Sequence, residues 1–214
     1  MTEPVRRGPA APGGGPAADI IVQRRWARLA AVAGIAAPAI YAVLLSAPMP
    51  RAATASLAAA FGLLLIAASV GVYHFIAAHR VTLSLQLGVL LNIIAGALVT
   101  SMLFVQMAVR AGGDVVDAVG RVQLGLDAAW DVFIGCGTAL IAANLARHPR
   151  FGRIFAWSGI AIGLALIAVN LATFPTPPRE AGLVDLGPLV GLWYFAVSFQ
   201  VGRSLHWLHD VTSR

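Results

Sequence analysis

The feature of this sequence that most constrains its fold is a series of apolar runs, each about as long as a lipid bilayer is thick. A helix needs about 20 apolar residues to cross roughly 30 Å of hydrocarbon. Six such runs cover residues 29–47, 54–78, 82–109, 127–146, 154–174 and 185–205, with prolines, glycines and charged residues between them. We therefore predict an all-α fold, a polytopic transmembrane helix bundle with six spans.

The composition agrees with lipid as the solvent and excludes several classes of protein. Only 11% of the residues are charged and 59% are hydrophobic, whereas about a quarter of the residues of a soluble domain are charged. The fifteen basic residues are all arginines and flank the apolar runs, so the net charge of +6 does not indicate nucleic-acid binding. Without lysine, Schiff-base chemistry on a lysine is excluded. The single cysteine, Cys136, excludes a disulfide framework within one chain.

The arginines also predict the orientation, since short cytoplasmic loops of membrane proteins hold the excess of positive charge. Eleven arginines fall in the N-terminal segment, in the loops after the second and fourth runs, and at the C-terminal end. The four others are Arg51, Arg110, Arg121 and Arg179. We therefore expect both termini in the cytoplasm, with the membrane domain at 20–210. Residues 1–19, rich in Pro, Gly and Ala, are expected to be a disordered tail rather than a cleaved signal.

The approach to the fourth run carries acidic residues at helical spacing. Residues 111–126 are expected to form an extracytoplasmic loop with a short amphipathic helix, for which Asp114 is a suitable cap. Asp117, Arg121, Asp127 and Asp131 then lie on one stripe. This spacing predicts Asp127 near the outer interface and Asp131 about one turn inside the hydrocarbon.

An ionisable group at that depth is costly and by default marks a site or a buried pair, so Asp131 is the best functional candidate. The residues that could form a polar pocket with it are Asp127, Asn170, Gln106, Thr173 and Asp185. Such a pocket would face outward and suit a cation, a proton or a small polar solute. The alternative is that Asp131 reaches interfacial water or pairs with Arg110 or Arg121.

Other polar residues favour structural roles. Asp185 is expected to cap the sixth span, and Asn92 and Asn144 are expected to form hydrogen bonds between helices, although they could also line a path. The five histidines fall on the cytoplasmic side, which favours interfacial side chains over haem or metal ligands. No HExxH, GxSxG or Walker motif is present, so nothing favours an enzyme, and no cofactor is predicted.

The C-terminal half carries a resemblance. The phrases AWDVFIGCGTAL, ARHPRFGRIFAWSGIAIG, NLATFPTPP and VDLGPLVGLWYFAV resemble an uncharacterised family of small bacterial multi-pass membrane proteins. The resemblance implies a bacterial inner membrane and a six-helix body, and it implies no activity.

The sequence favours two functions equally over a third, a haem or metal redox enzyme. The first is a small transporter or permeation protein with an outward-facing polar pocket at Asp131. The second is a non-catalytic accessory or assembly subunit that contacts a membrane-protein partner or a second copy of itself. Its contacts would use small residues four apart, as at Gly159 and Gly163 or Gly187 and Gly191. The transporter hypothesis predicts that Asp131 faces the bundle interior beside Asn170.

Overall fold

The computed structural model describes residues 16–46, 48–111, 117–179 and 181–212, and this part of the chain is helical without strands. Its helices are α1 (Pro16–Ser46), α2 (Arg51–Ala77), α3 (Leu83–Ala111), α4 (Asp117–Leu145), α5 (Arg153–Thr173), α6 (Gly187–Arg203) and α7 (Leu205–Thr212). Most of the predicted tail, residues 1–15, lies outside the described residues, as does Asp114, the predicted cap.

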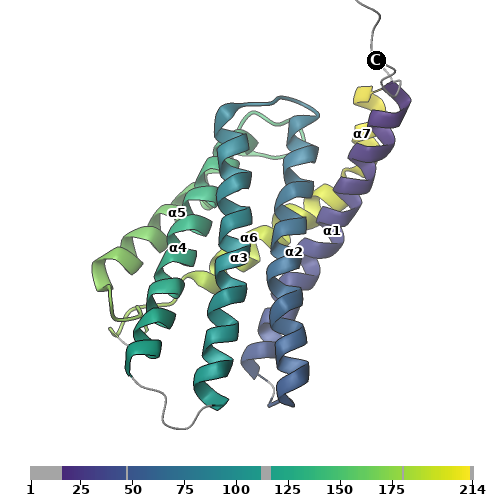
Figure 1. The fold of residues 1–214 in the computed structure, drawn as a ribbon. Helices are drawn as coiled ribbons and strands as arrows, with labels where there is room; N and C mark the ends of the chain where they lie inside the picture. The colour runs from purple at the N-terminus through teal and green to yellow at the C-terminus, as the bar shows by residue number, and fades with distance from the viewer. Residues whose placement is uncertain (1–15, 47, 112–116, 180, 213–214) are drawn as a thin grey trace, which may run out of the picture.

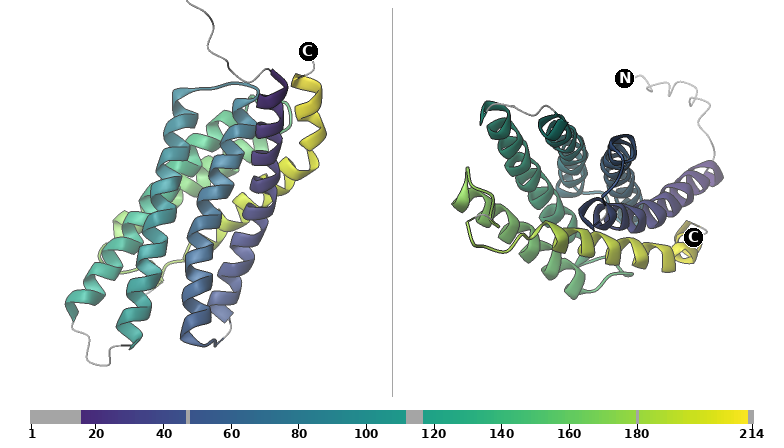
Figure 2. Two further views of the ribbon diagram at one scale, coloured as in Figure 1. Left: turned by 45° about the vertical axis from the view of Figure 1, so that its right-hand side comes forward. Right: turned by 90° about the horizontal axis from the view of Figure 1, so that it is seen from below.

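The helices form a closed ring in which each helix packs on the next and α6 returns to pack on α1. Successive long helices run in opposite directions, and α6 crosses the others obliquely (Figure 1 and Figure 2). The start of α1, α7 and the connections 78–82 and 146–152 lie at one end, which we call the arginine-rich end (Figure 1). Residues 48–50, 174–179 and 181–186 and the start of α4 lie at the other, the acidic end (Figure 1).

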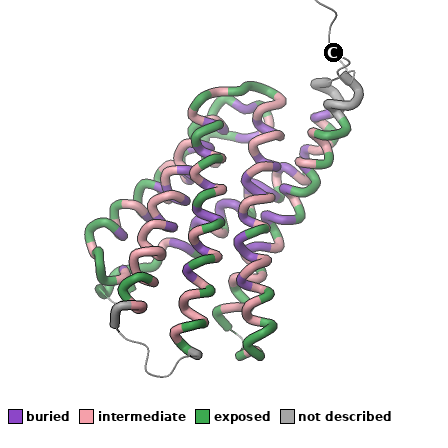
Figure 3. The backbone as a smooth tube through the Cα atoms, viewed as in Figure 1, coloured by how far each residue is buried: buried purple, intermediate pink, exposed green. Residues whose placement is uncertain are grey.

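Five helices among the described residues, α1 to α5, are long and apolar enough to cross a membrane. The sixth predicted span is also a helix, but α6 has only 17 residues. Large apolar side chains remain exposed around the bundle, among them Leu63, Leu83 and Ile154, while buried residues face inward (Figure 3). An apolar outer surface of this extent is expected for a protein that contacts lipid rather than water.

Helix α4 is continuous from the acidic end into the bundle. Its 29 residues correspond to about 44 Å, more than the roughly 30 Å of hydrocarbon. Residues 117–126, expected as an amphipathic segment before the span, are therefore the first turns of the same helix.

Glycines let several helices approach one another closely inside the ring. A Cβ atom added at Gly163 of α5 would lie 2.5 Å from the Gly135 carbonyl oxygen of α4. One added at Gly159 would lie 2.6 Å from the Trp193 ring of α6. These two glycines of α5 are thus buried in contacts within the chain.

At the arginine-rich end, His148 packs in an aromatic cluster that joins the α4–α5 connection to α2 and α7. Its ring centroid lies 5.3 Å from that of Phe75, 5.2 Å from that of Phe151 and 4.8 Å from that of Trp207. The Arg150 backbone N–H donates a hydrogen bond of 3.2 Å to His148 Nδ1. Burial, together with the charges of His79 and Arg150, lowers the pKa of His148 to about 4. The sequence placed this histidine at the interface, whereas the side chain is buried.

The lowered pKa predicts that stability falls in acid. At pH values between the ordinary histidine pKa of about 6.5 and the folded pKa of about 4, His148 binds a proton in the unfolded chain but not in the folded chain. Lowering the pH through this window should therefore reduce the free energy of unfolding, by at most about 1.4 kcal/mol per pH unit. In His148→Asn, the thermal midpoint of unfolding in detergent should no longer show this part of its dependence on pH. The control His206→Asn, an exposed histidine, should keep it, and equal slopes in all three proteins would contradict the prediction.

Candidate functional site

The predicted site residue Asp131 lies inside the bundle. Its side chain is only 5% exposed and it faces Asn170 of α5, which is equally buried. The Asn170 amide lies within hydrogen-bonding reach of the Asp131 carboxylate. It also donates a hydrogen bond of 3.0 Å to the Leu166 carbonyl oxygen, which fixes its orientation. The two predicted residues therefore meet between α4 and α5.

Two further carboxylates lie close to Asp131. Asp127, one turn earlier on α4, and Asp185, just before α6, are near enough for their charges to act on Asp131. Asp185 Oδ1 accepts a hydrogen bond of 2.8 Å from the Gly187 N–H at the first residue of α6. It therefore satisfies a backbone donor at the start of the helix, as expected of a cap, although the N-cap position itself is Leu186. We call Asp127, Asp131 and Asp185 the acidic cluster.

The acidic cluster has no basic counterpart within the described chain. No arginine there lies within ion-pairing distance of these carboxylates, and Arg110 and Arg121 are exposed. The Asp131 Oδ1 atom is buried and has no hydrogen-bond partner in the described structure. Here Asp131 thus neither pairs with an arginine nor reaches the surface.

The other two predicted pocket residues are less closely tied to the cluster. Thr173 donates its hydroxyl to the Val169 carbonyl oxygen at 3.1 Å, which is a bond within α5. Gln106 of α3 is half-buried, and no hydrogen bond joins it to the cluster in the described residues. A hollow beside Asp127, Asn170 and Pro177, with about 10 Å³ for the centre of a water molecule, has room for roughly one water. No three His, Cys, Asp or Glu side chains among the described residues are grouped so that they could hold a metal ion.

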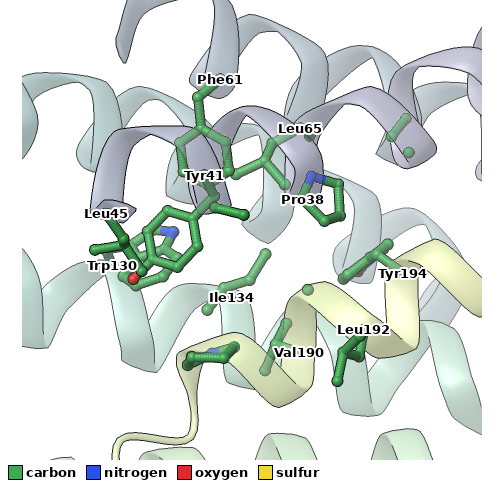
Figure 4. Close-up of a pocket in the computed structure, with 17 residues that line it drawn as sticks. Pro38, Tyr41, Leu45, Phe61, Leu65, Trp130, Ile134, Val190, Leu192 and Tyr194 are labelled. Atoms are coloured by element: carbon green, nitrogen blue, oxygen red, sulfur yellow. The ribbon is translucent and has the colours of Figure 1, made fainter. Parts of the chain in front are cut away.

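An apolar pocket of about 290 Å³ lies beside the acidic cluster, between α1, α2, α4 and α6. Its lining includes Pro38, Tyr41, Phe61, Trp130, Val190 and Tyr194 (Figure 4). Trp130 is 8% exposed, and its indole Nε1 has no hydrogen-bond partner in the described structure. The pocket is thus almost wholly apolar, and one buried donor in its wall is unused.

Three observations place the cluster at one end of this pocket. Tyr41 lies near enough to all three carboxylates for their charges to act on its hydroxyl. Trp130 directly precedes Asp131 on α4. A Cβ atom at Gly187, in the pocket lining, would lie 3.2 Å from Asp185 Oδ1 and 3.6 Å from the Trp130 ring. Together, the pocket and the cluster have the chemistry to hold an apolar body that ends in a positive charge.

A second buried polar group lies in the middle of the bundle and was only partly predicted. The Asn92 Nδ2 atom of α3 donates to the Tyr194 hydroxyl of α6 and to Ser69 Oγ of α2, the latter at 3.3 Å. Thr138 of α4 also lies within hydrogen-bonding reach of Tyr194. The sequence predicted that Asn92 forms hydrogen bonds between helices. It did not single out Tyr194, because this residue stands in an aromatic run that is typical of a hydrophobic core.

The fold and the site together define a class of protein and no more. The chain is an all-helical bundle with apolar helices that suit a membrane and with a carboxylate inside it. No family model matches the sequence, and no curated protein or solved structure is significantly similar to it.

The central polar group should contribute to stability through Tyr194. Tyr194→Phe removes the hydroxyl that Asn92 donates to and leaves buried polar atoms without a partner, which costs about 1–3 kcal/mol. The thermal midpoint in detergent should fall accordingly. Tyr73→Phe removes a hydroxyl from a half-buried tyrosine of α2 and should leave the midpoint nearly unchanged. Equal effects of the two substitutions would contradict this role for Tyr194.

Proposed function

We propose that this chain is a small membrane transport protein for a solute that joins a cationic group to an apolar body. The observation that carries the proposal is the buried Asp131 carboxylate, which has an unpartnered oxygen and no arginine beside it in the described chain. An apolar pocket of about 290 Å³ adjoins it, near the lower limit of roughly 300 Å³ for small-molecule sites.

A bound cation would supply the positive charge that the acidic cluster lacks. An ionised carboxylate away from water is costly without a partner of opposite charge. A cation at the acidic cluster supplies that charge, and the faces of Tyr41 and Trp130 attract cations as well. The apolar body of the solute would gain from burial against Phe61 and Val190, which line the pocket.

The same carboxylate can bind either a proton or the cation, and this property suits transport. A solute that enters displaces a proton, and a proton that enters displaces the solute. The site then binds the two alternately, so a proton gradient across the membrane could drive the solute in one direction.

The alternative is an accessory or assembly subunit that binds partners through its glycine faces. Gly159 and Gly163 pack against Trp193 and Gly135 of the same chain, so this face is occupied within the fold. The α5 face is thus not free for a partner, whereas Gly191 of α6 has open space around it. The two proposals predict different results for Asp131→Asn, because an accessory role would tolerate this substitution.

We expect Asp131→Asn to weaken binding of tetraphenylphosphonium, an aromatic cation, by on the order of tenfold or more, because the charge pair is lost. Saturable uptake of the labelled cation into proteoliposomes, with and without an imposed pH gradient, measures the effect. Retained binding and uptake in Asp131→Asn would overturn the proposal.

Two controls separate charge recognition from partition into lipid. Tetraphenylborate has the same shape and the opposite charge, so Asp131→Asn should not reduce its uptake. Asp210→Asn, in α7 at the arginine-rich end, removes one carboxylate elsewhere and should bind the cation like the unaltered protein.

We also propose that α6 crosses the membrane as a sixth span and that both termini face the cytoplasm. The 17 residues of α6 correspond to about 26 Å, slightly less than the hydrocarbon thickness, which local thinning can accommodate. Leu189, Leu192 and Phe195 of α6 are exposed, as expected of a lipid-facing surface. The excess of arginine at one end supports the orientation. A bacterial inner membrane remains a prediction from the sequence resemblance.

Cysteine labelling tests this orientation, with Cys136→Ala as the background. Ala181→Cys, at the acidic end, should react with a membrane-impermeant maleimide in intact cells. Pro149→Cys, at the arginine-rich end, should react only after the membrane is permeabilised. Both positions are exposed, so a difference reports the side of the membrane. The reverse pattern, or equal labelling of both in intact cells, would contradict the proposed topology.

A further inference from the structure

A second pocket, of about 390 Å³, lies at the arginine-rich end between the α2–α3 connection and the facing parts of α4 and α5. Its polar lining consists of His79, Arg80, Thr82, Ser84, Asn144 and Arg147. It is separate from the apolar pocket, with which it shares no lining residue. Nothing in the proposed transport of a cation uses it.

The charge in this pocket is positive and unbalanced. Arg80 and Arg147 are exposed, and within the described chain neither side chain has a hydrogen-bond or ion-pair partner. The sequence has no Asp or Glu between Asp19 and Asp114, or between Asp131 and Glu180. Hence α2, α3, α5 and the two connections around the pocket carry no carboxylate, and an anionic ligand would supply the missing charge.

The floor of the pocket is a hydrogen-bonded polar surface that is already ordered. Thr82 Oγ1 donates to Asn144 Oδ1 at 2.6 Å, and Asn144 Nδ2 donates to Ser84 Oγ at 3.1 Å. Asn144 Nδ2 also donates to the Leu140 carbonyl oxygen at 2.8 Å, which fixes the amide on α4. These bonds hold the start of α3 against the end of α4 and so set the distance between the two arginine-bearing segments.

One wall of the pocket is apolar and continues onto the outer surface of the bundle. Trp157 of α5 lines the pocket and is 65% exposed, and Ile160 lies one turn further along the same wall. The ligand therefore meets two arginines on one side and an apolar surface on the other. A phospholipid has both an anionic headgroup and apolar chains, whereas a free inorganic anion has no apolar part to contact this wall.

We propose that this pocket binds the phosphate group of an anionic phospholipid, with an acyl chain along Trp157 and Ile160. The planar guanidinium groups of Arg80 and Arg147 match pairs of phosphate oxygens. Basic pockets between membrane helices are known to take lipid headgroups in this way. The proposal does not depend on the transport function.

Retention of lipid by the purified protein tests the proposal. Native mass spectrometry from a neutral detergent, with equal amounts of phosphatidylglycerol and phosphatidylcholine added, should show preferential retention of phosphatidylglycerol. Arg80→Gln with Arg147→Gln should reduce that retention by on the order of tenfold. Arg80→Lys with Arg147→Lys keeps the charge without the guanidinium fork and should give an intermediate loss.

The matched control is Arg25→Gln with Arg203→Gln, which removes the same charge from exposed arginines at the same end. It should retain phosphatidylglycerol like the unaltered protein, while circular dichroism verifies that every variant is folded. Equal losses in the pocket and control variants would overturn the proposal, since they would indicate attraction to the surface charge as a whole. Displacement of the lipid by millimolar inorganic phosphate would also overturn the assignment to lipid, in favour of phosphate from solution.

Discussion

The absence of water along the helices is the constraint on which the rest of this structure depends. In lipid, backbone N–H and C=O groups must bond to one another rather than to water, which leaves no room for unpaired strands or open loops at that depth. Polar side chains face the same condition, so each needs a partner inside the bundle. Asn92 meets it through its Nδ2 atom, which donates to Tyr194 and Ser69, while its Oδ1 atom has no partner in the described structure. Asp131 meets it only in part, with Asn170 beside it and one oxygen unpartnered.

The molecule is electrically asymmetric from one end to the other, and its two pockets follow that asymmetry. Carboxylates gather at the end of an apolar pocket between α1 and α6. Arginines line a polar pocket between α2, α4 and α5 at the opposite end. A mobile cation suits the first and a fixed anionic lipid suits the second. Anionic lipid bound at the arginine-rich end would also reinforce the orientation that the arginines favour.

The sequence could predict the helices, because their signal is local: apolar runs of sufficient length between polar breaks. It also gave Asn170 as one of several candidate partners of Asp131, since depth in the membrane follows from position along each span. It could not predict how each helix is rotated about its axis, and the pockets depend on that rotation. Gln106 has a suitable depth, yet no described hydrogen bond joins it to the cluster. His148 is buried because the α4–α5 connection folds against Phe75 and Trp207, a contact between segments far apart in sequence.

Helix α4 carries Asp127 and Asp131 in its middle turns and Asn144 in its last turn, and no break interrupts it. The helix therefore behaves as one stiff rod that spans both pockets. Any tilt or axial rotation of that rod displaces the carboxylates and the amide together. A movement of α4 that enlarged or closed one pocket would therefore move part of the wall of the other as well.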